Sequence, residues 1–127
     1  MNALLKPLEM AFRPMRAEDL DALIKIERAA YPYPWTLGNF RDCLESGYSC
    51  WVGEVEGALS GYWVMMLAAG EGHILNCCLA PAWQRRGFGR TLVEHLGGRF
   101  TLDSTPGSGT RATVELPAVA PGMAAHA

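Results

Sequence analysis

Residues 76–96 of the chain read NCCLAPAWQRRGFGRTLVEHL. The run from His73 to Leu79, which leads into this stretch, is nearly all apolar, as expected for a strand covered on both faces in the middle of a sheet. Gly87 and Gly89 follow soon after Pro81, and apolar residues then recur at helical spacing. The order predicts a central strand, a glycine loop and a helix.

The glycine loop has the composition of an anion-binding site. At a helix N-terminus, unpaired backbone N–H groups and the positive end of the dipole converge, and glycines allow a phosphate to approach the backbone closely. Positive charge for a diphosphate would come from Arg85, Arg86 and Arg90. The spacing fits neither the GxGxxG of a dinucleotide site nor the GK[ST] of a P-loop. From spacing alone, a phosphate site and a helix start with solvated arginines are equal alternatives.

The context of the loop resembles a known signature. Gln84-x-x-Gly87-x-Gly89, directly after a strand and directly before a helix, is similar to the Gln/Arg-x-x-Gly-x-Gly/Ala signature of the GNAT acetyltransferase superfamily. Within it, residues 11–96, about two-thirds of the chain, resemble the bacterial ribosomal-protein-alanine N-acetyltransferases. The residues that carry this likeness are Arg13 to Arg16 with Asp19, Pro32 to Trp35, Asn76, and Pro81 to Leu96.

The resemblance implies an N-acetyltransferase that uses acetyl-CoA and acetylates a protein N-terminal amine, such as the alanine of a small-subunit ribosomal protein. It also implies that the pantetheine arm pairs like an extra strand with the central strand, and that the pyrophosphate lies against the glycine loop. A strand N–H would polarise the acetyl carbonyl, and the amine would attack it without a covalent enzyme intermediate. The expected CoA-binding residues are Cys77, Cys78, Leu79, Arg85, Arg86, Gly87, Phe88, Gly89 and Arg90.

Two helices are expected before the sheet. The apolar face of the first contains, at i, i+3, i+4 and i+7, Leu20, Leu23, Ile24 and Glu27. We interpret Glu27 as a carboxylate that reaches water at the edge of this face, with a place in a substrate pocket as the alternative. The prolines between Tyr31 and Trp35 exclude a helix there and predict an aromatic loop. Thr36 can cap a second helix that ends near Gly47.

Three strands are expected after the helices, at Ser49 to Val55, Ala58 to Leu67 and His73 to Leu79. The turns between them are short enough for antiparallel hairpins. Together with an extended segment at Ala11 to Arg16, they predict an α+β fold, an α/β sandwich. We expect a GNAT-like mixed, mainly antiparallel sheet with flanking helices, truncated at the C-terminal end.

The resemblance stops after Leu96. A family member would present a glutamate general base and a tyrosine general acid further on, and neither is found there, so the catalytic residues are left unassigned. Gly97 and Gly98 favour a helix stop, and alternating residues then predict a β-hairpin over residues 97–117, ahead of a disordered tail at 118–127. A strand at Phe100 to Ser104 beside the central strand, with Asp103 near the missing base, is a weaker alternative.

The hairpin residues resemble the last glycine box of sensor histidine kinase ATPase domains, without the other elements of an ATP site. The sequence therefore predicts a partial acetyltransferase domain at 11–96, joined to an unrelated hairpin at 97–117. The alternative to an active enzyme is an inactive coenzyme A binding remnant, or a chimeric or truncated gene product.

The composition excludes several classes of protein. With 127 residues, 50% of them hydrophobic, the chain is expected to be one soluble globular domain. A net charge of −2 gives no basic field for nucleic acid. No apolar run is long enough to span a membrane and no signal-peptide pattern is present, so a cytoplasmic location is expected.

The cysteines are expected to be reduced. They show no CxxC spacing, and no histidine falls at a zinc-ligand interval, so no metal is expected at Cys43, Cys50, Cys77 and Cys78. Cys77 and Cys78 should point to opposite faces of the central strand, which makes a disulfide between them improbable.

Overall fold

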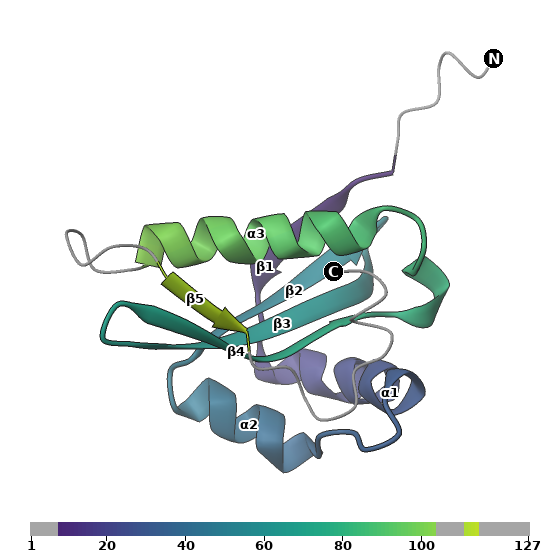
Figure 1. The fold of residues 1–127 in the computed structure, drawn as a ribbon. Coiled ribbons are helices and arrows are strands. Elements are labelled where there is room, and N and C mark those ends of the chain that lie inside the picture. The colour runs from purple at the N-terminus through teal and green to yellow at the C-terminus, as the bar shows by residue number, and fades with distance from the viewer. Residues whose placement is uncertain (1–7, 104–110, 115–127) are drawn as a thin grey trace.

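The computed structural model describes residues 8–103 and 111–114 of the chain. The sheet has the strand order β1-β2-β3-β4-β5 (Figure 1). Its first four strands are antiparallel, and the fifth joins β4 in parallel: β1 (Met10–Pro14), β2 (Ser49–Val55), β3 (Ala58–Ala68), β4 (Glu71–Leu79) and β5 (Arg111–Val114). The predicted α+β class with a mainly antiparallel sheet is confirmed.

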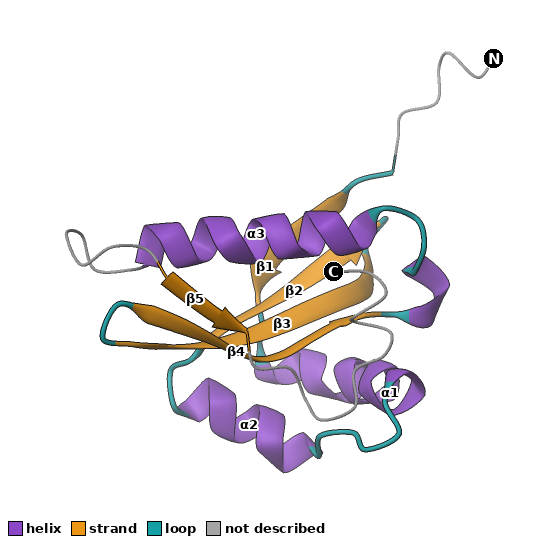
Figure 2. Cartoon of the chain, viewed as in Figure 1, coloured by secondary structure: helices purple, strands orange, loops and turns teal. Residues whose placement is uncertain are grey.

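Helices cover both faces of the sheet (Figures 1 and 2). Two short 3-10 turns, η2 (Ala17–Asp19) and η3 (Pro81–Trp83), precede the first and third of the helices α1 (Leu20–Ala30), α2 (Leu37–Glu45) and α3 (Phe88–Asp103). α1 and α2 pack on one face and α3 packs on the other. The predicted bounds of β2 are confirmed, whereas β4 begins at Glu71, inside the turn expected before His73.

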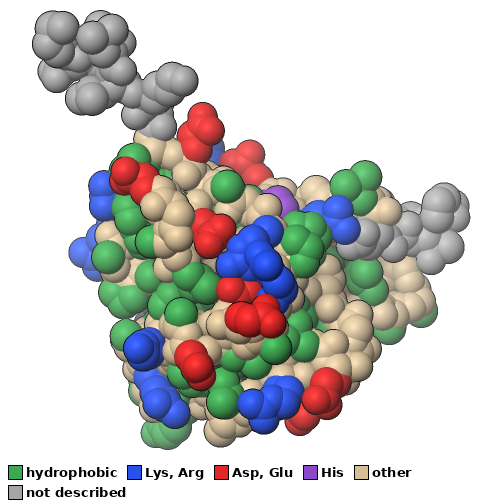
Figure 3. Space-filling view, turned by 180° about the vertical axis from the view of Figure 1, so that it is seen from behind, with side chains coloured by type: hydrophobic (Ala, Val, Ile, Leu, Met, Phe, Trp, Pro, Cys, Tyr) green, Lys and Arg blue, Asp and Glu red, His purple; other side chains and the backbone are tan. Residues whose placement is uncertain are grey.

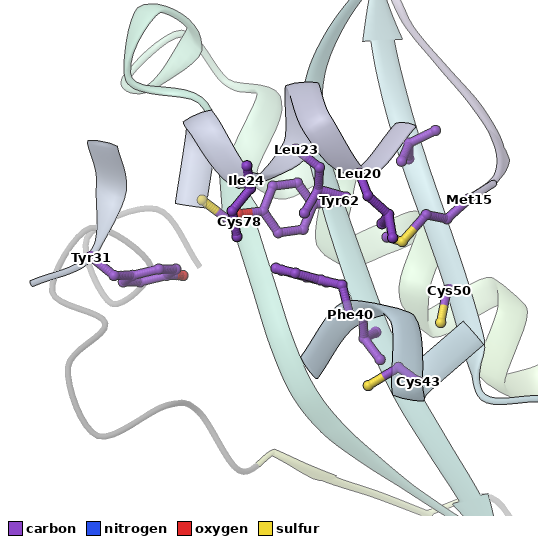
Figure 4. Close-up of a cluster of buried hydrophobic side chains, with 12 residues drawn as sticks. Met15, Leu20, Leu23, Ile24, Tyr31, Phe40, Cys43, Cys50, Tyr62 and Cys78 are labelled. Atoms are coloured by element: carbon purple, nitrogen blue, oxygen red, sulfur yellow. The ribbon is translucent and has the colours of Figure 1, made fainter. Parts of the chain in front are cut away.

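The α1 and α2 face has its own hydrophobic core (Figure 4). Leu20, Leu23 and Ile24 of α1 are buried there, as their helical spacing predicts. The Tyr62 ring of β3 lies between the helices and the sheet, edge-on to Phe40 of α2 with ring centroids 5.7 Å apart. This packing fixes both helices on the middle of the sheet.

The connection between the two helices is the predicted aromatic loop. Residues 31–36 form neither helix nor strand. The Thr36 hydroxyl accepts a hydrogen bond from the Asn39 N–H at 3.2 Å, and the Asn39 side chain accepts one from the Thr36 N–H at 2.9 Å. The predicted cap at Thr36 is therefore confirmed, in the form of a reciprocal capping box.

The opposite face of the sheet is covered by α3. Its buried side chains recur every four residues and form one line along the helix: Phe88, Leu92, Leu96 and Phe100. A Cβ atom at Gly72 of β4 would lie 2.6 Å from the Phe100 ring, so only glycine lets the helix approach the sheet this closely. From Phe88 to Phe100, α3 thus packs on the sheet, with contacts to β1, β3 and β4.

The helix stop predicted at Gly97 and Gly98 is wrong, because α3 continues to Asp103. Each glycine costs a helix about 1 kcal/mol relative to alanine. The two glycines together cost about 2 kcal/mol, and full burial of the Phe100 ring, favourable by roughly 1.5–3 kcal/mol, offsets this. Tertiary packing therefore overrides the local signal.

The predicted hairpin over residues 97–117 is also wrong in its first strand, since Phe100 and Leu102 are helical. Its second run does form a strand, but β5 pairs in parallel with residues 71–74 of β4. Asp103 lies in α3, so the alternative that placed it on a strand beside β4 is excluded. The predicted disordered tail lies outside the described residues.

A charge cluster ties β1 to the turn before α1. The guanidinium of Arg13 donates to both carboxylate oxygens of Asp19, at 2.8 and 2.7 Å, and to Glu54 of β2 at 3.3 Å. The hydrogen bonds from Arg13 hold the pKa of Asp19 below its usual value. Acidic and basic side chains are interspersed on the face shown in Figure 3, which forms no continuous basic surface there.

An aromatic cluster surrounds His95 of α3. The Phe12 ring stacks on His95 at a centroid distance of 3.8 Å, and the Trp63 indole N–H donates to His95 Nδ1 at 3.2 Å. The bond from Trp63 requires Nδ1 to be unprotonated, because an indole N–H can only donate. Burial, with a smaller contribution from Arg99, lowers the pKa of His95 below its ordinary value.

The continuation of α3 predicts opposite outcomes for two neighbouring substitutions. Phe100→Ala should lower the free energy of unfolding by about 3–5 kcal/mol, because it empties a buried site between helix and sheet. Leu102→Ala, on the exposed side of the same turn, should change it by less than about 0.5 kcal/mol. Urea unfolding followed by circular dichroism measures both. Similar effects at the two positions would contradict the helix.

His95 predicts a pH dependence of stability. Below about pH 6.5 the unfolded chain binds a proton that folded His95 does not, so the stabilisation is present above that pH. It is lost as the pH falls from about 6.5 through the lower pKa of the folded state. The urea concentration at the midpoint of unfolding should therefore decrease when the pH is lowered from 7.5 to 5. It should decrease less in His95→Gln. An equal fall in both proteins would refute this assignment.

Candidate functional site

Strand β4 changes its pairing at one residue. Val64 of β3 faces Asn76 and Met65 faces Ile74, so Leu75 is an extra residue that forms a β-bulge in β4. The pairing of β4 with β5 ends at Ile74. Among the described residues, no strand pairs with 75–79 on the side away from β3. We call this side of residues 75–79 the outer edge of β4.

The backbone groups along the outer edge can be assigned from the pairing. Ala80 N–H donates to Ser60 O of β3 at 2.7 Å, so alternation turns the N–H and C=O groups of Cys77 and Leu79 away from β3. Two side chains confirm this direction. The Tyr31 hydroxyl donates to Cys77 O at 2.6 Å, and Gln84 Nε2 donates to Leu79 O at 2.9 Å.

The side chains of the two cysteines do not lie on this edge. Cys77 is buried in the core under α3, and Cys78 is buried in the core under α1 and α2, so their prediction to opposite faces is confirmed. Burial raises the pKa of the Cys78 thiol to about 12, so it is protonated at neutral pH. A protonated, buried thiol is a poor nucleophile, which disfavours a covalent intermediate on Cys78.

The predicted glycine loop follows η3 and opens α3. Gly87 has a φ of +85°, a backbone conformation that favours glycine, and α3 starts at the next residue, Phe88. Arg85 and Arg90 are exposed, and the guanidinium of exposed Arg86 lies 4.6 Å from the Trp83 ring centroid. The loop thus combines a helix N-terminus with three positive side chains.

The expected CoA-binding residues lie in two adjoining segments. The outer edge carries Cys77, Cys78 and Leu79, and the loop that directly follows it contains Arg85 to Arg90. Gln84 joins the two, because it belongs to the loop and bonds the last residue of β4. Within the loop, Phe88 differs from the three arginines, since its side chain is buried between α3 and the sheet and anchors the helix start instead of facing solvent.

Glu27 is the largest departure from the sequence prediction. Its side chain does not reach water: the residue is 1% exposed. Glu27 Oε1 accepts hydrogen bonds from the Tyr62 hydroxyl at 2.7 Å and from Asn76 Nδ2 at 3.0 Å. Oε2 accepts one from the Trp35 N–H at 2.9 Å. We call Glu27, Tyr62, Asn76 and Trp35 N–H the Glu27 network.

The Glu27 network lies beside the outer edge. Asn76 directly precedes Cys77, and Tyr31, whose hydroxyl binds Cys77 O, directly follows α1. Burial raises the pKa values of Tyr31 and Tyr62, so both phenols stay protonated and donate. Sequence reasoning did not foresee the roles of Tyr31 and Tyr62. The only local signal was Glu27 itself: an acidic residue on an apolar helix face needs hydrogen-bond donors if it is buried.

The described residues contain neither a metal-binding cluster nor a membrane-spanning helix. No group of three or more His, Cys, Asp or Glu side chains in residues 8–103 and 111–114 is arranged to hold a metal ion. Within the same ranges, no helix has the length and apolar character needed to cross a bilayer.

Comparison with known proteins gives a consistent family assignment. Residues 20–99 match the acetyltransferase (GNAT) family. A Bacillus subtilis (strain 168) protein is 33% identical over 86 residues, which cover 66% of this chain and 57% of that protein; its name assigns it provisionally as a ribosomal protein bS18-alanine N-acetyltransferase. The ribosomal protein bS18-alanine N-acetyltransferase of Escherichia coli (strain K12) is 28% identical over 82 residues, covering 65% and 55%. The chain spans about half the length of these relatives.

Solved structures agree. The crystal structure of the ribosomal-protein-S18-alanine N-acetyltransferase from Escherichia coli superposes with a TM-score of 0.68 at 25% identity, over 72% of this chain and 59% of that one. The PaiA N-acetyltransferase from Thermoplasma acidophilum, solved in complex with coenzyme A, shares the fold at a TM-score of 0.64 and 16% identity, over 74% and 73%. The family match ends at residue 99 and residues 97–103 are helical, so the histidine kinase resemblance finds no support.

The loop geometry predicts opposite signs for two glycine substitutions. Gly87→Ala should destabilise the protein by about 1–2 kcal/mol, because alanine is strained at positive φ. Gly97→Ala is the matched control in the exposed part of α3, where a Cβ meets open space. It should stabilise the protein by up to about 1 kcal/mol. Thermal unfolding reports both, and a stabilising Gly87→Ala would disprove the loop conformation.

Proposed function

Because the chain belongs to the acetyltransferase (GNAT) family, we propose that it binds acetyl-CoA along the outer edge of β4 and transfers the acetyl group to a protein N-terminal amine. The observation that carries the proposal is the outer edge itself. A strand whose outward N–H and C=O groups meet no strand in the described chain, and which runs directly into a basic helix N-terminus, fits an extended ligand that ends in a diphosphate.

The pantetheine arm is an extended chain with two amide groups, so it can add to a sheet edge as a strand does. We place it along Cys77, Cys78 and Leu79. The pyrophosphate then lies against residues 85–90, where the N–H groups at the start of α3 and the charges of Arg85, Arg86 and Arg90 neutralise it. Gly87 and Gly89 leave room for the phosphate to approach the backbone.

In the proposed reaction the chain forms no covalent bond with the acetyl group. A neutral amine attacks the thioester carbonyl, the C–N bond forms and the C–S bond breaks, while the amine loses a proton and the thiolate gains one. The outward N–H of Cys77 is the group we assign to the carbonyl oxygen, where negative charge develops. The acceptor we propose is the N-terminal alanine of a ribosomal protein, because both relatives above are named for bS18-alanine acetylation.

The second candidate is binding of coenzyme A without transfer. It is favoured by one sequence observation: no tyrosine follows Tyr62, so the general acid expected from the family pattern is missing. The two candidates share the donor site and differ only in turnover. One experiment therefore separates them.

Calorimetric titration with coenzyme A should show one site per chain. Arg86→Ala should weaken binding about tenfold or more, because a charge-assisted hydrogen bond contributes roughly 1.5–3 kcal/mol. Arg41→Ala, an equally exposed arginine on α2, is the matched control and should leave the affinity unchanged.

A turnover assay with acetyl-CoA and a peptide bearing an N-terminal alanine completes the test. Binding with turnover supports the transferase, and binding without turnover supports the second candidate. If coenzyme A does not bind, or if Arg86→Ala and Arg41→Ala behave alike, the proposed donor site is wrong.

A further inference from the structure

In the Glu27 network, three separate parts of the fold donate hydrogen bonds to one carboxylate. Tyr62 comes from β3, Asn76 from β4 and the Trp35 N–H from the aromatic loop, while Glu27 itself is on α1. The side chains of Glu27, Tyr62 and Asn76 are all at most 1% exposed. Taking a carboxylate out of water is costly unless donors surround it, and here each oxygen has at least one.

The network fixes the orientation of Asn76. A carboxylate only accepts hydrogen bonds, so the amide nitrogen of Asn76 must be the atom that faces Glu27. Asn76 Oδ1 is then left buried, and no hydrogen-bond partner is found for it in the described chain. An unsatisfied buried acceptor costs roughly 1–3 kcal/mol, so Asn76 is not the residue that stability alone would favour.

Two contacts from the C-terminal end of α1 lie on either side of the peptide group between Asn76 and Cys77. Glu27 accepts a hydrogen bond from the Asn76 side chain before it, and the Tyr31 hydroxyl donates at 2.6 Å to Cys77 O, in the peptide group after it. Tyr31 and Glu27 are themselves joined, because the Tyr31 N–H donates to Glu27 O at 3.0 Å. The C-terminal end of α1 is therefore hydrogen-bonded to β4 immediately after the bulge at Leu75.

We infer that Glu27 is a positioning residue for acetyl transfer: with Tyr31 it fixes the Cys77 N–H on the outer edge of β4, so that this donor is aimed at the thioester oxygen before the ligand binds. The inference rests on the proposed function. Pre-aligned donors stabilise developing negative charge without reorganisation during the reaction. A bulged strand edge would otherwise be free to adjust its direction, because the bulge interrupts the regular pairing.

Glu27→Gln breaks the network with almost no change in volume. An amide has one acceptor oxygen and one donor nitrogen, so it cannot accept from Tyr62 and Asn76 on one side and from Trp35 N–H on the other. Tyr31→Phe removes the second contact on β4 by deleting one hydroxyl. It serves as the independent variant should Glu27→Gln fold poorly. Met15→Ala, in the same core but between β1 and η2, is the matched control for a loss of stability.

The readout is the infrared stretching band of the thioester carbonyl in bound acetyl-CoA, labelled with 13C at that carbon. In the natural chain the band should be narrow and shifted to lower wavenumber than in solution, because an aligned N–H polarises the carbonyl. In Glu27→Gln and Tyr31→Phe it should broaden and move back toward the solution value, with affinity for coenzyme A within about threefold of the natural chain, since the glycine loop is untouched. Met15→Ala should keep the natural band.

Where the chain turns over, kcat should fall about tenfold or more in both variants, with KM for acetyl-CoA little changed, since only alignment in the transition state is lost. A band unchanged in both variants, or unshifted in the natural chain, overturns the inference while leaving coenzyme A binding intact. A loss in Met15→Ala as large as in Glu27→Gln overturns it too, because the effect would then be one of stability. No binding to the natural chain overturns the proposed function, and this inference with it.

Discussion

The structure depends on one constraint at β4, which must be a central strand over its first half and a free edge over its second. The bulge at Leu75 allows both. Up to Ile74 the strand is paired on two sides, and beyond it only the β3 side is paired in the described chain. In the second half both faces are buried: Cys77 and Leu79 belong to the core under α3, and Cys78 belongs to the core under α1 and α2. The result is a sheet edge between two cores, to which an extended ligand can add as a strand. A shift of β4 by one residue in its pairing would turn every side chain of the strand to the wrong face.

An open edge inside a protein needs its backbone acceptors satisfied, and this chain uses its own side chains for that purpose. Tyr31 bonds the carbonyl of Cys77 and Gln84 bonds the carbonyl of Leu79. Both donors come from elements that also define the site: Tyr31 ends α1, and Gln84 begins the glycine loop. Tyr31 and Gln84 therefore satisfy carbonyl groups that could otherwise pair with a strand of another chain, and they also fix the position of the edge against α1 and α3.

Sequence reasoning succeeded where one local period decided the element. The α1 face, the Thr36 cap, the bounds of β2 and the strand, loop and helix order of residues 76–96 all follow from patterns within one turn or one strand. It failed where distant packing competed with a local signal. Gly97 and Gly98 indicated a stop, whereas Phe100 has a place against Gly72 that holds the helix together. Glu27 was placed on the correct face, but its partners Tyr62 and Asn76 are 35 and 49 residues away, and no period connects them.

Donor binding and turnover are physically separable in this fold. The elements of the proposed donor site, β4, the glycine loop and α3, follow one another within residues 71–103. Proton transfer makes a different demand, since it requires groups whose pKa values lie near the working pH. Cys78 and Tyr31, next to the outer edge, do not meet it, because burial raises the pKa of Cys78 to about 12 and also raises that of Tyr31. These two groups can donate hydrogen bonds and hold the strand, whereas in the proposed reaction the proton of the amine would leave through another acceptor. The proposed donor site therefore lies within a chain that spans about half the length of these relatives, while the proposed turnover depends on what accepts that proton.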